Sequence, residues 1–349
     1  MPDRITGIVA VAVVVSVGLA LGLFAAGVAP VGSDDASDEQ GVAVESIAGN
    51  STVTVTYTNA SGASRQFVVS DVDPRLTDAV HGWAIVEHSS LPPALRDDDV
   101  RNGVVRFGEW ALVGATKSAT VAVDGTELTV VVPQGRDVDP GRKAGFVREF
   151  ADPYSLSQDG DDPIVLVSVP DALPSEGLMY HDDRGYVTIQ AFWDGDAHSV
   201  WIHEYVHARQ DFRTAPGMVW FREASARYLS YRFMQEQYEG VSQADVRQQL
   251  DSYPVYDGVT LANRTTWEGT EANYHEGARL LATVDTEIRA ESGGSHSLVD
   301  VFRAMNTEEE PITVERFVAL VERYADDDQS WIADAIRGNE RVKDRMRRP

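Results

Sequence analysis

Residues 199–208 read SVWIHEYVHA and place two histidines four positions apart, with a glutamate directly after the first. On an α-helix, positions i and i+4 lie on one face, so His203 and His207 can direct both imidazole rings at one metal ion. Glu204 lies beside the first of them, where its carboxylate can reach a water on the metal rather than the metal itself. The H-E-x-x-H pattern therefore predicts a zinc site that includes a general base.

A third protein ligand is expected on the next helix. Catalytic zinc takes three protein ligands and keeps a fourth position open for water or substrate. Residues 220–229, WFREASARYL, predict a helix that folds back against the first. Glu223 lies among its apolar and small residues, where a carboxylate needs a partner, and we expect it to bind the metal. The alternative is an ion pair of Glu223 with Arg222 or Arg227 on a solvated face.

A third histidine close in sequence is excluded as a ligand. The metzincin pattern requires Gly three residues after the second His, and His six residues after it. Gln210 and Arg213 occupy those two positions. Each zinc histidine also needs an acceptor for the ring nitrogen that faces away from the metal. Three nearby aspartates could provide one, and the sequence does not choose among them: Asp194, Asp196 and Asp211.

Together these motifs resemble the gluzincin clan of zinc metallopeptidases. The likeness rests on H-E-x-x-H followed by W-x-x-E-x-x-A-x-Y at 220–228, and on NYHEGARLL at 273–281, which resembles the Y-x-x-G-A-x-x-L segment of aminopeptidase N-like enzymes. The resemblance implies one Zn²⁺ per chain and a peptide or protein substrate. It also implies that Tyr274 stabilises the oxyanion, a role that a phenol O–H can perform without changing charge. The alternative is that Tyr274 only caps or packs the following helix.

One element of that family is missing. Aminopeptidases of this type carry a G-x-M-E-N strand whose Glu holds the free amino terminus of the substrate. Here residues 176–181 read EGLMYH, and no Glu follows the Met. We therefore expect an endopeptidase in preference to an aminopeptidase. The strand at 185–190, GYVTIQ, could be an edge strand that binds extended substrate through its backbone.

The predicted reaction is hydrolysis of a peptide bond. Zinc lowers the pKa of a bound water toward neutrality, and Glu204 accepts its proton and passes it to the leaving amine. Tyr274 then donates a hydrogen bond to the oxyanion. Two alternatives remain open. One is a catalytically silent, zinc-stabilised surface binding module, and the other is a zinc hydrolase that acts on a non-peptide amide or ester.

The segment from Ile5 to Ala29 contains no charged residue. It exceeds the roughly 20 residues that cross a bilayer and the apolar core of about 7–15 residues found in signal peptides. We expect an uncleaved membrane anchor, with cleavage and secretion as the alternative. Arg4 precedes the segment and no Lys or Arg follows it until Arg65, so the positive-inside rule places the rest of the chain outside the cell.

Acidic residues dominate the composition. The chain has 55 Asp and Glu against 30 Lys and Arg, for a net charge of −25. This resembles proteins of halophilic archaea, and because salt screens self-repulsion we expect folding to require high salt. The same charge argues against nucleic acid as a partner. Cysteine is absent, so disulfides and Cys-ligated metals are excluded.

Strands followed by helices predict an α+β fold. The expected organisation is a membrane anchor at 1–30, an acidic linker at 31–40, a β-rich antiparallel domain at 41–140 and a catalytic domain at 141–349. The β-rich segment includes a hairpin that turns at Asp124-Gly125. By resemblance, the catalytic domain is thermolysin-like, with a short sheet and a mainly helical second half. Periodicity predicts its helices at about 198–212, 218–238, 242–250, 271–291, 296–305, 312–325 and 328–346.

Overall fold

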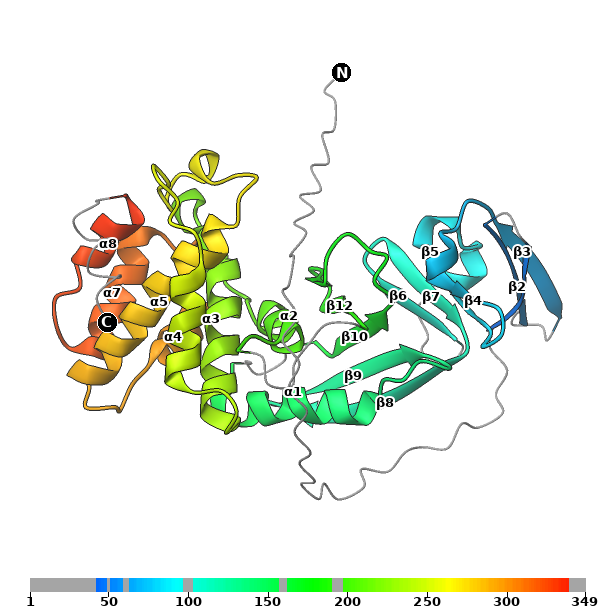
Figure 1. Ribbon diagram of the computed structural model, residues 1–349, viewed down its shortest axis with the longest axis horizontal. Helices are drawn as coiled ribbons and strands as arrows, with labels where there is room; N and C mark the ends of the chain where they lie inside the picture. The colour runs from blue at the N-terminus through cyan, green and yellow to red at the C-terminus, as the bar shows by residue number, and fades with distance from the viewer. Residues whose placement is uncertain are drawn as a thin grey trace. The chain divides into compact units, whose positions relative to one another are not determined.

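The computed structural model describes residues 42–48, 51–58, 63–96, 103–156, 162–189 and 197–338. The expected anchor and acidic linker lie outside these residues, and no helix within them is long and apolar enough to cross a membrane. The described chain divides into two compact units (Figure 1). The first takes the residues before 123, together with 127–146 and 162–189. The second takes residues 123–126, 147–156 and 197–338.

Antiparallel sheets form much of the first unit, as the sequence predicts. One sheet has the order β1-β2-β3 and the other the order β4-β5-β7-β6. The alternation of Thr and Val in β2 buries Val53 and Val55 completely, because successive side chains of a strand point to opposite faces. The strands are β1 (Val42–Ala48), β2 (Thr52–Thr58), β3 (Ser64–Val69), β4 (Thr77–Asp78), β5 (Trp83–Glu87), β6 (Val104–Phe107) and β7 (Trp110–Gly114).

A five-stranded mixed sheet has the order β11-β12-β10-β9-β8. The expected hairpin joins β8 to β9, and Asp124 and Gly125 both have positive φ, as a type I′ turn requires. β10 runs parallel to both β9 and β12. The strands are β8 (Thr116–Val123), β9 (Thr126–Pro133), β10 (Ile164–Val169), β11 (Gly177–Met179) and β12 (Arg184–Thr188).

The expectation that residues 185–190 form an edge strand is wrong. β12 pairs with β10 on one side and with β11 on the other, so both of its backbone edges are engaged. The chain reverses through the turn at 181–183, where Asp183 has a φ of 55°, and this folds Gly177–Met179 back onto β12. The short β11 therefore takes the edge position that the sequence assigned to residues 185–190.

Helices build the second unit, in agreement with the predicted helical second half of the chain. They match the expected segments from 218 to 325 closely, but α2 ends at Ala208 because Arg209 leaves helical geometry and caps it. Of the helix expected at 328–346, the structure has only Trp331–Ile336, and residues 339–346 lie outside the described residues. The elements are the last residues of α1 (Pro140–Tyr154), then α2 (Val200–Ala208), α3 (Trp220–Gln237), α4 (Gln243–Ser252), α5 (Ala272–Glu291), α6 (Leu298–Asn306), α7 (Val314–Ala325) and α8 (Trp331–Ile336).

A close approach of α3 to α5 organises this unit, and the two helices lie side by side in Figure 1. The approach depends on Gly277 of α5. A Cβ atom built there would lie 2.5 Å from the Cβ of Ala224 and 3.1 Å from a ring carbon of Trp220. Any side chain at position 277 would therefore push the two helices apart.

A buried carboxylate fixes the same helices in place. Asp285 of α5 is 2% exposed and accepts hydrogen bonds from the Tyr228 hydroxyl of α3 and from the backbone N–H of Leu298 at the start of α6, both at 2.7 Å. Arg289 Nε donates to it at 2.8 Å. Because each bond comes from a different element, Asp285 specifies how α3, α5 and α6 pack.

We predict that Gly277→Ala destabilises the protein by roughly 1–3 kcal/mol through overpacking. Gly145→Ala in α1 is the matched control, because nothing lies within 4 Å of a Cβ atom built there. At position 145 the same substitution should stabilise the protein by about 0.8–1 kcal/mol, because alanine has a higher helix propensity than glycine. Urea unfolding in high salt measures both variants, and equal effects at the two positions would contradict the close approach at Gly277.

Candidate metal centre

Two helices of the second unit bring the three predicted ligands together. α2 presents His203 and His207 one turn apart, and α3 presents Glu223. His203 Nε2 lies 3.0 Å from His207 Nε2, and Glu223 Oε2 lies 3.3 Å and 3.1 Å from these two nitrogens. Among the described residues, this is the group of His, Asp and Glu side chains whose ligand atoms converge closely enough to hold a metal ion.

The triangle of ligand atoms fits a zinc ion. Ligands at about 2.0–2.1 Å from a tetrahedral zinc lie about 3.3 Å from one another. Two imidazole nitrogens only 3.0 Å apart would repel each other through their lone pairs unless a cation or a shared proton lay between them. Two histidines and one glutamate are also a donor set of catalytic zinc sites, in which the fourth position stays open.

Gln210 orients the ring of His207. Its side-chain NH₂ donates to the Arg222 carbonyl at 2.8 Å and to Ser225 Oγ at 3.0 Å. The amide oxygen is therefore left to accept from His207 Nδ1, at 3.0 Å. This leaves the lone pair of His207 Nε2 free for a metal. Gln210 lies just beyond the end of α2, and its backbone N–H bonds to the His207 carbonyl at 3.2 Å, so the turn that ends the helix brings its side chain to the ring.

His198 meets the outer nitrogen of His203. Its Nε2 lies 3.4 Å from His203 Nδ1. Burial, with nearby Arg227 and His203, lowers the pKa of His198 well below its usual value, so its ring is neutral and can accept the His203 N–H. Gln210 and His198 thus take the role for which the sequence considered three aspartates. Two of those, Asp194 and Asp196, lie outside the described residues.

The predicted catalytic side chains lie beside the ligands. Glu204 is 4% exposed on α2. The ring of Tyr274, from α5, lies 6.0 Å from that of His203 and is inclined to it by 19°. Burial and the carboxylates of Glu223 and Glu204 raise the pKa of Tyr274, so the phenol is protonated at neutral pH and can donate a hydrogen bond.

The two histidines differ in charge before a metal binds. Burial lowers the pKa of His203 to about 4. Burial also opposes charge on His207, but the Glu223 carboxylate outweighs it and raises the pKa of His207 to about 9. The pKa of Glu223 is held well below its usual value by the two rings. At neutral pH a metal ion must therefore displace one proton, from His207.

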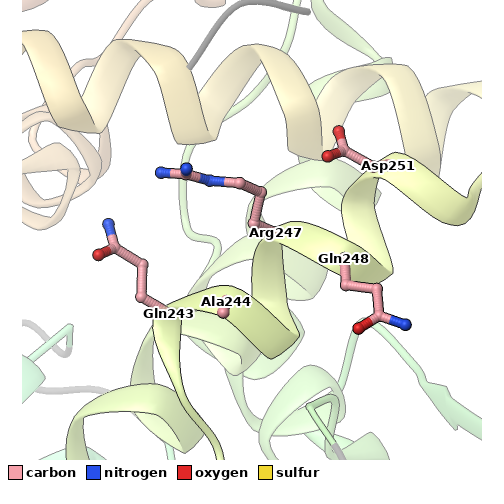
Figure 2. A pocket seen from close by; sticks show the side chains of 5 residues that line it. All are labelled: Gln243, Ala244, Arg247, Gln248 and Asp251. Carbon is pink, nitrogen blue, oxygen red and sulfur yellow. The ribbon is translucent and has the colours of Figure 1, made fainter.

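A hollow of about 400 Å³ lies elsewhere on the second unit, along α4 (Figure 2). All five lining residues come from that one helix, and none is aromatic or a metal ligand: Gln243, Ala244, Arg247, Gln248 and Asp251. It offers no convergent catalytic groups, so the chemistry of the chain is assigned to the metal centre.

Comparison with known proteins finds solved structures with a similar fold. An aminopeptidase N family protein from Idiomarina loihiensis superposes with a TM-score of 0.54 at 11% identity, over 82% of this chain and 59% of that one. An M1 zinc metallopeptidase from Deinococcus radiodurans, a mutant bound to a Tyr-Ser-Ala substrate, gives 0.48 at 16% identity, over 66% and 54%. Neither a protein-family model nor a curated protein matches the sequence.

The likeness to the Idiomarina loihiensis protein shows the fold. The chain spans little more than half the length of the two solved structures, so it corresponds to a part of each. Within that part it shares the fold of an aminopeptidase N family protein, in agreement with the gluzincin resemblance of its sequence motifs.

We predict that zinc affinity depends on pH with a slope of one proton. Since His207 is protonated below about pH 9 and the other ligands are not, affinity should rise about tenfold per pH unit from pH 6 to 8 and level off above pH 9. Competition with a chelator of known protonation measures this. An affinity that does not change across this range would contradict the assignment of the proton.

We predict that Gln210→Leu lowers zinc affinity by roughly 10- to 100-fold, because His207 loses the acceptor that orients its ring. Gln210→Glu is the control, since its carboxylate can accept the same N–H. Metal titration measures both variants, with circular dichroism as the check on folding. Wild-type affinity in the leucine variant would show that the ring needs no such support.

Proposed function

We propose that the chain is a zinc-dependent metallopeptidase whose centre is formed by His203, His207 and Glu223. The observation that carries the proposal is the convergence of their three ligand atoms within 3.3 Å. A purely structural zinc site has no use for a general base, yet Glu204 is buried directly beside the ligands. The shared aminopeptidase N fold supports the same function.

The side chains of this centre have distinct roles. Zinc bound there supplies a Lewis acid for the peptide carbonyl and lowers the pKa of a water. Glu204 is buried on α2, where it accepts the proton of the attacking water and returns it to the leaving amine. The Tyr274 hydroxyl stays protonated and donates to the oxyanion as charge develops. Gln210 and His198 keep the two histidine rings in position.

The proposed specificity is that of an aminopeptidase. The contrary expectation, an endopeptidase, rested on the absence of a glutamate after Met179. The fold shared with an aminopeptidase N family protein supports removal of residues from the amino terminus instead. A free amine would then be recognised by a group other than the one found in the G-x-M-E-N strand.

The proposal also places the enzyme at the cell surface. The uncharged segment from Ile5 to Ala29 would anchor it, with the catalytic part outside the cell. The net charge of −25 supports work in high salt. Carbonate extraction of membranes, with protease treatment of intact cells, tests this placement.

We predict that Glu204→Gln lowers peptide hydrolysis at least about 100-fold while zinc stays bound. The exposed Glu239→Gln removes the same charge elsewhere and should retain turnover. The full chain would be incubated in detergent at about 2–4 M salt with an unbiased peptide mixture, and its cut sites mapped by mass spectrometry.

The positions of the cuts decide the specificity. Loss of single amino-terminal residues would support an aminopeptidase, and internal cuts would support an endopeptidase. Zinc binding without any cut would contradict the peptidase proposal and favour a binding module or a hydrolase of non-peptide substrates.

A further inference from the structure

Arg227 is a half-buried cation without an acidic partner. It lies one helical turn after Glu223 on α3, and no carboxylate in the described part of the chain forms an ion pair with it. Two buried or partly buried arginines of the neighbouring helix α5 are paired. Arg279 binds Glu276 at 3.0 Å, and Arg289 binds Asp285 at 2.8 Å. A guanidinium removed from water without a counter-charge is costly, so its presence here calls for a ligand.

Neutral aromatic groups surround this guanidinium. Nη1 donates to the hydroxyl of Tyr253 at 2.9 Å and to that of Tyr231 at 3.5 Å. Its Cζ atom lies 5.2 Å from the centre of the Tyr274 ring. Nε is buried without an acceptor among the described residues, and no hydrogen bond from Nη2 is formed within them. Nη2 is therefore the nitrogen of the guanidinium that is left to donate to an anion.

The aromatic surroundings are themselves held in place. The ring of Tyr253 stacks on that of His275, with centres 3.6 Å apart and planes 8° from parallel. Arg279 Nη2 donates to the Tyr253 carbonyl at 2.6 Å, and His275 Nδ1 lies 2.8 Å from the Tyr256 hydroxyl. The guanidinium is thus fixed before a ligand arrives, which lowers the entropic cost of binding one.

The charges of the zinc-bound centre also favour an anion at Arg227. Glu223 and Glu204 each contribute one negative charge, so a divalent cation between the ligands neutralises both. Arg227 then remains as an uncompensated positive charge. Tyr274 connects it to the centre, because the same ring lies 6.0 Å from the ring of His203 and 5.2 Å from the guanidinium. A substrate that carries a carboxylate at this point would neutralise the site.

The spacing along α3 limits where that carboxylate lies in the substrate. Four residues of helix rise about 6 Å, which separates the backbone positions of Glu223 and Arg227. Successive Cα atoms of an extended peptide are about 3.8 Å apart. A carbonyl at the metal and a carboxylate at Arg227 therefore belong to the same residue or to adjoining residues of the substrate.

We propose that Arg227 is a specificity-determining residue that binds a carboxylate on a residue adjoining the scissile bond. The carboxylate is either an acidic side chain or a free carboxyl terminus, since both present the same two oxygens to the guanidinium. This inference rests on the proposed peptidase function and adds a substrate class to it.

Paired substrates test the inference. One pair differs only by Glu or Gln on the amino side of the scissile bond, a second by Glu or Gln on the carboxyl side, and a third by a free or amidated carboxyl terminus. The wild type should prefer the carboxylate member of one pair by roughly 10- to 100-fold in kcat/KM. The pair that shows the preference identifies the source of the carboxylate. A ratio near one in all three pairs would overturn the proposal.

Variants show whether Arg227 causes the preference. Arg227→Gln should bring the ratio to about one, and Arg227→Lys should retain part of it as a point charge. Arg222→Gln removes a positive charge next to Glu223 and should keep the full ratio. If Arg227 only positioned Tyr274, both members of each pair would slow equally in Arg227→Gln, and an unchanged ratio would overturn the proposal.

Measuring the affinity for peptides tests the inference without requiring turnover. Zinc-loaded Glu204→Gln protein would be titrated with the same three pairs of peptides by calorimetry, and then again with Arg227→Gln added. Tighter binding of the carboxylate member of one pair, lost with Arg227→Gln, supports the carboxylate site even if no peptide is cut and the peptidase proposal fails. Equal affinity for the members of every pair overturns it.

Discussion

The hydrogen bonds of Gln210 are the constraint on which the metal centre depends. One side chain joins the ring of His207 on α2 to the carbonyl of Arg222, the residue directly before Glu223 on α3. It therefore sets the direction of one ligand and the distance to another at the same time. A second buried hydrogen bond joins the two helices at the start of α2, where the Ser199 N–H donates to Ser230 Oγ of α3 at 2.7 Å. Both contacts pair groups that would be costly to bury alone.

A third helix adds the remaining chemistry. α5 approaches α3 closely because Gly277 has no side chain, and this brings Tyr274 to the ring of His203. The same approach places Tyr253 and His275 around Arg227. Asp285 holds the far end of the contact through Tyr228. The centre thus combines donors from α2 and α3 with a phenol from α5, all on rigid elements, as precise catalysis requires.

Local patterns account for what the sequence could predict. His203 and His207 follow from helical spacing alone, and the hairpin at Asp124-Gly125 follows from turn chemistry. Glu223 required a second helix folded back on the first, and Tyr274 required a family resemblance. The roles of these side chains in binding and catalysis remain predictions, although the structure brings the four together.

Contacts between distant segments account for what the sequence missed. No local rule links His198 to the outer nitrogen of His203, or Tyr253 to Arg227. The prediction that residues 185–190 form an edge strand was wrong for the same reason. Strand order depends on pairing between distant segments, and β11 folds back to pair with β12. The family comparison could not supply Arg227 either, since the motifs that carry the resemblance do not include it.

Anomalous diffraction at the zinc edge, from crystals grown with zinc, tests the central claim most directly. The account predicts one strong peak per chain, about 2.0–2.1 Å from His203 Nε2, His207 Nε2 and one Glu223 oxygen, with the fourth position held by water or a substrate group. Glu204 should approach that water without binding the metal. A peak at other residues, or a fourth protein ligand that closes the site, would contradict the account.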